Sequence, residues 1–323
     1  MRIRTSIVTL ATTALLLASA GVATAADAIS SLIPASSEIY FTLDTRKLID
    51  SDVFKKLYNE RLDSSKRAQI ELVNSLVGID VLKDVNRVHI WGKIDQDDTV
   101  TAAIDGRFNQ EKLVTLLKAN ETYDSFAEGD LTIHHWVDNK DAKERYGTFV
   151  SSDRILVGNS KSALANALAA RKDKSANVTS TPNASSFSPA GDAVFYAFAI
   201  TPEGKAGKNP NLKDLRSAVL KCDLTKAGFT ADSMINMATA QSAKDVSDLA
   251  QAALVLARLQ GDDPKLTDLV SALSINHAEG SGDITMKFAL PQEKLFKLID
   301  EAKVDVDVDV DASAESGAEA ETK

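Results

Sequence analysis

Two short segments carry the side chains of this sequence that are best suited to form a binding site. The segments VHIW (88–91) and IHHW (133–136) each place a histidine two residues before a tryptophan, and they contain both tryptophans of the chain. Side chains two apart on a strand point to the same face of a sheet. If these segments are neighbouring strands, the two pairs form one aromatic platform made of His89, Trp91, His134 and Trp136.

Such a platform could hold a sugar-like or apolar ligand by stacking, or a metal ion if a carboxylate joined the histidines. No acidic partner is placed beside them by the sequence, so we predict no metal site. The alternative interpretation, which we favour, is a cross-strand aromatic ladder covered by a helix, with the histidines hydrogen-bonded or solvated. The ligand site is therefore a hypothesis.

Motifs of known catalytic chemistry are missing from the chain. We find no Gly-rich phosphate loop, no HExxH and no G-x-S-x-G, and the single cysteine, Cys222, rules out CxxC. The glycines of AEGSGD (278–283) lie between two expected strands and suit a hairpin turn. A Ser-His-Asp triad assembled from distant residues stays open, since its members need not be close in sequence. We predict a protein that is not an enzyme, with no catalytic residues and no cofactor.

The first 25 residues have the order of a secretory signal peptide. Arg2 and Arg4 precede an apolar run from Ile7 to Leu17, and small residues end at an Ala-Thr-Ala site (23–25). This run is shorter than the ~20 residues that a membrane span needs. We expect cleavage before Ala26 and an exported protein, in the bacterial periplasm or outside the cell, with no transmembrane segment after cleavage.

Charge and cysteine content exclude several kinds of partner. The formal net charge is −9, and it becomes −11 once the two arginines of the leader are removed. A mildly acidic protein is a poor partner for nucleic acid or for an anionic membrane surface. Lone Cys222 permits no internal disulfide and is either a small buried thiol or an exposed one. The Val-Asp run and the small acidic residues of 304–323 predict a disordered acidic tail rather than a calcium site.

Hydrophobic periodicity predicts strands followed by helices. Alternation indicates strands at 33–44, 85–94, 99–108, 131–137, 145–152, 154–159 and 192–200, and further strands at 221–230, 233–241, 273–279 and 283–290. Helical spacing covers most of 45–77, and we expect its apolar stripe to form part of the core. Shorter helices follow Asn109 and Asn159, and Ser242 with Asp245 resembles a capping box that opens another. Two more helices are expected to begin at Asp263-Pro264 and at Pro291. Hairpins outnumber strand–helix–strand crossovers. The predicted fold class is therefore α+β, with a mainly antiparallel sheet built from strand–strand–helix units.

An internal echo suggests two degenerate halves. QEKL opens a helix after a hairpin at 110–113 and again at 292–295, and Pro-Ala precedes an aromatic strand at 34–35 and at 189–190. Two echoes in the same order favour an ancient duplication over chance. The predicted organisation is a signal peptide (1–25), a first α+β half (26–174), a Ser/Asn/Pro-rich linker (175–191), a second α+β half (192–303) and the tail (304–323).

The segments PASSEIYFTLDTRKLIDSDVFKKL, FNQEKL and YGTFVSSDRILVGNSKSALANAL resemble a set of exported bacterial proteins that are known only as uncharacterised. The resemblance implies an address and a fold, and it implies no activity or site residues. We expect an exported envelope interaction or structural protein that works through its sheet faces and acidic tail. A periplasmic carrier of an apolar or sugar-like ligand is the alternative, and a hydrolase with a spatially assembled site is a third possibility. The expected partner is accordingly an unknown envelope protein or a small ligand.

Overall fold

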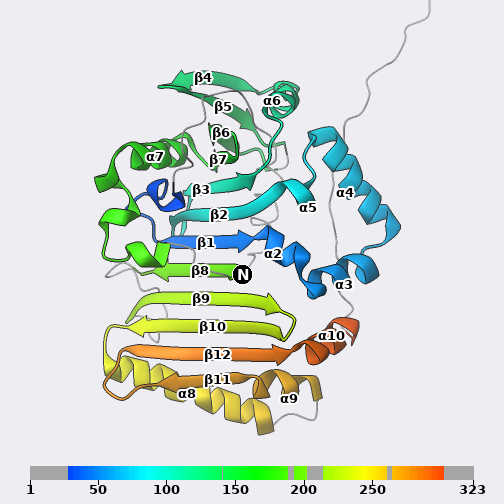
Figure 1. Ribbon diagram of the computed structural model, residues 1–323. Coiled ribbons are helices and arrows are strands. Elements are labelled where there is room, and N and C mark those ends of the chain that lie inside the picture. The colour runs from blue at the N-terminus through cyan, green and yellow to red at the C-terminus, as the bar shows by residue number, and fades with distance from the viewer. Residues whose placement is uncertain (1–27, 140, 188–192, 202–213, 260–263, 302–323) are drawn as a thin grey trace, which may run out of the picture.

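The computed structural model describes residues 28–139, 141–187, 193–201, 214–259 and 264–301. The expected signal peptide, the acidic tail and the second Pro-Ala pair lie outside these residues. The described strands form a single twelve-stranded sheet in which all neighbours are antiparallel, in the order β11-β12-β10-β9-β8-β1-β2-β3-β7-β6-β5-β4 (Figure 1). The α+β prediction is confirmed. Both predicted halves contribute to one continuous sheet, joined where β1 pairs with β8.

The bounds of the elements show how closely local pattern anticipates structure. The strands are β1 (Ile39–Asp44), β2 (Val85–Lys93), β3 (Gln96–Gly106), β4 (Asp124–Glu128), β5 (Leu131–Val137), β6 (Glu144–Ser151), β7 (Arg154–Gly158), β8 (Phe195–Ile200), β9 (Leu215–Thr225), β10 (Gly228–Met237), β11 (Leu273–His277) and β12 (Asp283–Pro291). The helices are α2 (Thr45–Asp50), α3 (Asp52–Arg61), α4 (Ser64–Val77), α5 (Val81–Asp84), α6 (Gln110–Lys118), α7 (Lys161–Lys172), α8 (Ala240–Leu259), α9 (Pro264–Ser271) and α10 (Gln292–Glu301). Short 3-10 turns are η1 (Ile29–Ser31), η2 (Lys174–Ala176), η3 (Val178–Ser180) and η4 (Ala184–Phe187).

Side-chain caps explain where several helices begin. The Asn109 side chain accepts a hydrogen bond from the Lys112 amide at 3.0 Å, as expected for the first residue before α6. The expected capping box at Ser242 is wrong, because α8 begins earlier, at Ala240. There Thr239 Oγ1 accepts from the Ser242 amide, and the Ser242 hydroxyl donates to Asp214. A hydroxyl three residues upstream therefore supplies the cap.

The turn between β9 and β10 lies earlier than the sequence suggested. Expected strands at 221–230 and 233–241 place a turn near residue 231, whereas Thr225 and Gly228 face each other as the last pair of the β9–β10 hairpin. Gly228 has φ of +136°, and a Cβ there would lie 2.1 Å from the Leu290 carbonyl oxygen on β12. The alternation alone could not locate the turn, because its decisive feature is a close approach to a third strand.

We expect Gly228→Ala to lower the free energy of unfolding by about 3 kcal/mol or more, because it adds both backbone strain and a clash with backbone. Gly280→Ala is the matched control. Gly280 also has positive φ, at +77°, but no atom lies within 4 Å of the position that an added methyl group would take, so a loss of about 1 kcal/mol is expected. Urea unfolding of both variants makes the comparison. Equal losses would show that the approach to β12 is not tight.

The sheet has two faces that are covered differently. We call the face of Tyr40 and Trp91 face A, and the face of Phe41 and Ile90 face B. On face A, α7 and the 3-10 turns bury a large core whose members include Trp91, Leu164 and Phe187. On face B, α6 and α8 bury separate, smaller cores at two places on the sheet.

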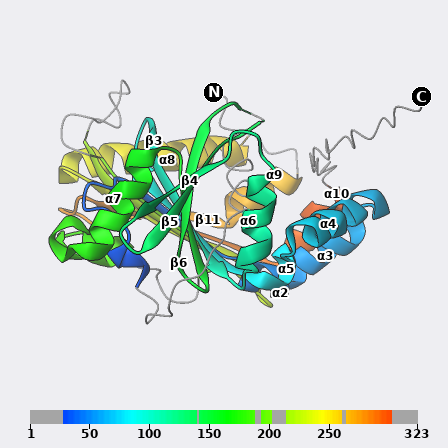
Figure 2. The same cartoon turned by 90° about the horizontal axis from the view of Figure 1, so that it is seen from above.

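Helices α2 to α5 gather with α10 at one end of the strands, as both views show (Figures 1 and 2). Lys56 of α3 bonds Asp300 of α10 at 2.8 Å and lies over the Phe296 ring. From 45–77 we expected an apolar stripe that forms part of the core. That expectation is wrong for the described side chains of α2, α3 and α4, none of which is buried. An amphipathic pattern indicates a helix with an apolar side, and it does not say how completely that side is covered.

The segment expected as a linker contributes to the core where it is described, at 175–187. Val178 of η3 and Phe187 of η4 are buried in the face A core. Asn177 is buried as well, and its side chain donates to the Ala170 carbonyl at 3.1 Å and accepts from the Thr179 amide at 3.0 Å. Ser, Asn and Pro therefore form hydrogen-bonded turns here, which press two apolar side chains against the sheet.

The echoed QEKL segments both open helices that follow hairpins, as predicted. They begin α6 after β2–β3 and α10 after β11–β12. Their places in the sheet differ, because β3 is the second strand outward from β1 and β12 is the third strand outward from β8. Duplication stays a prediction. Among the described helices, none combines the length and apolarity needed to cross a membrane.

Candidate functional site

The two His/Trp pairs do not meet. The first pair lies on β2 and the second on β5, with β3, β7 and β6 between them. Trp91 belongs to the face A core, whereas Trp136 packs under α6 on face B. All four side chains are buried. The single platform is therefore wrong, because strand order and register put the pairs on opposite sides of the sheet.

His89 is part of a polar chain across four neighbouring strands on face A. Its Nδ1 lies 2.9 Å from the Tyr40 hydroxyl, and its Nε2 lies 3.4 Å from Asp105. Arg154 donates two hydrogen bonds to Asp105, at 2.5 and 2.9 Å. Both ring nitrogens of His89 thus contact protein groups, which leaves neither for a ligand. The chain ties β1, β2, β3 and β7 together.

Burial and charge set the protonation of this chain. Burial lowers the pKa of His89, although Asp105 acts in the opposite direction. Burial alone would raise the pKa of Asp105, but the hydrogen bonds and charge of Arg154, with a smaller part from His89, lower it to about 2. Burial also raises the pKa of the Tyr40 hydroxyl. At neutral pH a neutral histidine therefore lies between a neutral tyrosine and an ionised Asp–Arg pair.

The second histidine pair has different neighbours. His134 Nδ1 lies 2.9 Å from the Tyr123 hydroxyl, and the two rings are stacked. His135 points to the other face and stacks on Tyr146, with ring centroids 4.5 Å apart. Burial, helped by the charge of Lys118, lowers the pKa of His134 to about 4. Each histidine is thus packed against a tyrosine of its own region, and the ladder that we expected between the two His/Trp segments does not form, because three strands separate them.

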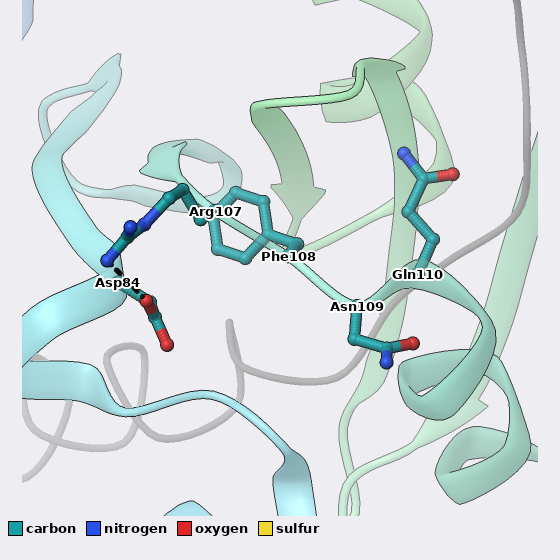
Figure 3. A pocket seen from close by; sticks show the side chains of 5 residues that line it. All are labelled: Asp84, Arg107, Phe108, Asn109 and Gln110. Atoms are coloured by element: carbon teal, nitrogen blue, oxygen red, sulfur yellow. Dashed lines mark hydrogen bonds and ion pairs between the residues drawn. The ribbon is translucent and has the colours of Figure 1, made fainter.

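A shallow surface depression lies where β3 leads into α6 (Figure 3). Its polar groups already have partners. Arg107 bonds the Asp84 carboxylate at 2.9 Å and the Lys83 carbonyl, and Asn109 caps α6. Gln110, on the far side of the Phe108 ring in Figure 3, reaches the Ser151 carbonyl at 3.5 Å. These contacts join α5, β3 and α6.

The clearest candidate is an open part of face B in the middle of the sheet. We call it the central apolar face, made of Phe41, Leu43, Ile90, Phe195, Ala197, Leu220, Cys222 and Ala231. Each of these side chains is partly exposed. The strand registers align them in rows, for example Leu43, Phe195, Cys222 and Ala231. The Phe41 and Phe195 rings stack with centroids 6.5 Å apart.

Helices α6 and α8 cover the strands on either side of the central apolar face and leave its side chains partly exposed. On one side α6 packs over Ile104, Ile155 and Val157, and on the other α8 packs over Ile235 and Ile284. Between them lie β2, β1, β8 and β9. None of the eleven residues of β9 is buried, although β9 has a strand on each side. An inner strand normally buries at least one face, whereas β9 is only partly covered by the described residues: Val219 packs at the edge of the face A core and Leu215 at the edge of the α8 core.

The chemistry of the central apolar face is uniform. None of its residues is charged. On β9 and β10, by contrast, face A carries charged residues such as Lys221 and Asp232. Cys222 lies near its centre. Burial, and to a lesser degree Asp232, raises the pKa of the Cys222 thiol, so the thiol is protonated at neutral pH. This surface suits an apolar partner and offers no acid, base or activated nucleophile. Within the described residues, no cluster of His, Cys, Asp and Glu could hold a metal ion.

One signal in the sequence pointed to this face. Leu220, Cys222 and Leu224 alternate with Lys221 and Asp223, which indicates a strand with one apolar side. No pattern along the chain could show that α6 and α8 would cover the strands on either side of this region and leave it open. The His/Trp segments were singled out because they contain both tryptophans of the chain. In the structure these side chains are buried in the core and do not form a ligand site.

Comparison with known proteins identifies a fold similarity. No protein-family model matches the chain, and no curated protein matches it. Three crystal forms of a protein named TP0453 resemble it. Crystal form III has a TM-score of 0.49 at 10% identity over 86% of this chain and 100% of that one. Form I gives 0.47 at 7% over 85% and 97%, and form IV gives 0.45 at 8% over 84% and 96%. At these values the similarity carries no functional argument.

Proposed function

We propose that this protein is an exported, non-catalytic interaction protein that binds an amphipathic helix of a partner on its central apolar face. The observation that carries the proposal is the partly exposed apolar middle of face B, flanked by α6 and α8. Contiguous exposed apolar surface on a folded protein usually marks an interaction site. The address comes from the leader sequence, and a bacterial envelope is the compartment that it supports.

The width of the partly exposed strip favours a helix as the occupant. Its four strands lie about 4.8 Å apart, so the strip is roughly 19 Å wide. A helix with its side chains is about 10 Å across and packs readily on a sheet face. One added helix between α6 and α8 would complete the layer that they begin on face B. Its apolar side would cover Phe41, Phe195 and Leu220.

The single cysteine offers a direct test. A benzophenone maleimide attached to Cys222 places a photo-crosslinker on the central apolar face without any substitution. After irradiation in an intact bacterial envelope, we expect a crosslink to one segment of a partner protein. Mass spectrometry of the crosslinked peptide should identify a segment with apolar residues at helical spacing.

Two variants of β10 make the test specific. Ala231→Glu puts a charge on the central apolar face and should reduce crosslinking at least tenfold. Thr230→Glu puts the same charge on the opposite face, one residue away, and should leave it unchanged. If the crosslinked molecule were a fatty acid or phospholipid, the central apolar face would bind an apolar ligand instead of a helix, and the protein would be a carrier. Equal crosslinking in both variants, or none in any, would overturn the proposal.

A further inference from the structure

Helix α8 has a second apolar side that faces away from the sheet. Leu249, Leu256 and Leu259 are 61%, 57% and 78% exposed. Val255 of α8 and two leucines of α9, Leu266 and Leu269, are exposed as well. We call these six residues the α8–α9 leucine surface. It holds six of the eight large apolar side chains that are exposed among the described residues.

Among the described residues, this surface lies apart from the side of α8 that packs on the sheet. Ala243 and Ser247 are the buried residues of α8. Val246, Ala250 and Leu254 lie on the same side of the helix and are partly buried. At 100° per residue, the middle of this stripe lies roughly 115–135° around the helix from Leu249 and Leu256. A surface helix ordinarily has one apolar stripe and a polar outer side. An outer side rich in leucine suits a partner helix that covers it.

We propose that the α8–α9 leucine surface joins two copies of this chain, with the α8 helices packed side by side and antiparallel. The spacing of the outer residues supports a helix partner. Leu249, Ala252, Leu256 and Leu259 follow one another at intervals of three, four and three residues, which is the spacing of a coiled-coil seam. Ala252, which is exposed, is small enough to admit a leucine from a facing helix.

Charge favours the antiparallel arrangement. The first half of α8 contains Asp245, Asp248 and Lys244, and its net charge is negative although Lys244 pairs with Asp248. The second half contains one charged side chain, Arg258. In an antiparallel pair the acidic half of one helix lies along the basic half of the other, and the helix dipoles oppose. A parallel pair would place the aspartates together. A twofold axis near the middle of the stripe makes the same residues contact each other in both copies.

The size of the surface sets the expected strength. The seam from Leu249 to Leu259 is about 15 Å long at 1.5 Å per residue, with Leu266 and Leu269 widening it. Stable dimers usually bury about 800 Å² per partner. Six leucine and valine side chains supply the core of a small interface, so the dimer should dissociate on dilution. This inference concerns a different surface from the central apolar face and is independent of the proposed function.

Sedimentation equilibrium of the exported protein across a thousandfold concentration range tests the association. We expect the mass to rise from that of one chain to that of two. Leu256→Glu should raise the dissociation constant at least tenfold, because it places a charge in the seam. Leu72→Glu is the matched control, since Leu72 is 48% exposed on α4, outside this surface, and it should dimerise like the unaltered protein. Ala231→Glu should also dimerise normally, which separates this result from the test of the central apolar face.

Engineered disulfides test the orientation. In a Cys222→Ser background, chains with Leu249→Cys and chains with Leu259→Cys should each remain uncrosslinked alone and form disulfides when mixed. Self-crosslinking of either variant alone would show a parallel pair and overturn the arrangement. A protein that stays monomeric at all concentrations, or dimerises equally with Leu256→Glu, would overturn the proposal itself. Monomers that float with phosphatidylethanolamine–phosphatidylglycerol vesicles in a Leu256-dependent way would assign the surface to a membrane instead.

Discussion

Trp91→Ala should lower the free energy of unfolding by about 3–5 kcal/mol, the usual cost of removing a large buried aromatic side chain. Trp91 has no exposed surface and packs in the face A core beside Tyr40 and beneath α7. Its strand lies near the middle of the sheet, where the surrounding strands have little room to collapse into the cavity. Urea unfolding followed by far-ultraviolet circular dichroism measures the loss.

Trp91→Phe separates packing from hydrogen bonding. Trp91 Nε1 has no hydrogen-bond partner among the described residues, so phenylalanine removes no such bond and should cost clearly less than alanine. Met234→Ala is the surface control, because Met234 is 46% exposed on β10, and it should stay within about 0.5 kcal/mol of the unaltered protein. If Trp91→Ala lowered the free energy of unfolding as little as Met234→Ala does, Trp91 would not be packed in the core, and a ligand-binding role for it would be supported.

Stability should fall by about 2–3 kcal/mol between pH 7.5 and 4.5 through the titration of His134 alone. Its pKa is about 4 in the folded protein, because burial and then Lys118 disfavour the charged form, against the ordinary value of 6.5 in the unfolded chain. Folding therefore favours the neutral ring. The stabilising contribution is complete above about pH 6.5 and is lost as the pH falls toward 4.

The measurement is the free energy of unfolding in urea at pH 7.5 and 4.5. His134→Gln, which does not titrate, should lose about 2–3 kcal/mol less than the unaltered protein over this interval. His277→Gln is the control, because His277 is partly exposed and its Nε2 contacts the Ser281 carbonyl at 2.8 Å. It should keep the full pH dependence. If His134→Gln kept it too, the ring would already be charged or solvated in the folded protein.

Most hairpins could be predicted from the sequence, because the signals that make them are local. The strand predicted at 131–137 matches β5 residue for residue, and α6 begins at the residue after Asn109. Short β4 was missed, because DSFAE (124–128) has no strong alternation. Its pairing with β5 stabilises the strand, although its own sequence has no strong preference for one. The β9–β10 turn was misplaced because a contact with β12 decides it.

The proposed site could be predicted only in part. The apolar alternation around Cys222 is visible in the sequence, and the partial exposure of β9 is not. Whether an apolar strand face is core or surface depends on which helix lies over it, and that depends on strand order. The same reason explains the His/Trp error. Each histidine does share a face with its tryptophan, but pairing across the sheet separates the two couples.

The amino-acid sequence by itself determined the antiparallel α+β character, most strand and helix positions and the cap at Asn109, because alternation, helical spacing and capping act over a few residues. Only the tertiary structure decided that β1 and β8 join both halves in one sheet, and that Trp91 and Trp136 belong to different cores. It also decided where face B stays open and which side of α8 faces outward. These features arise from contacts between residues far apart in the chain, and no local pattern encodes them.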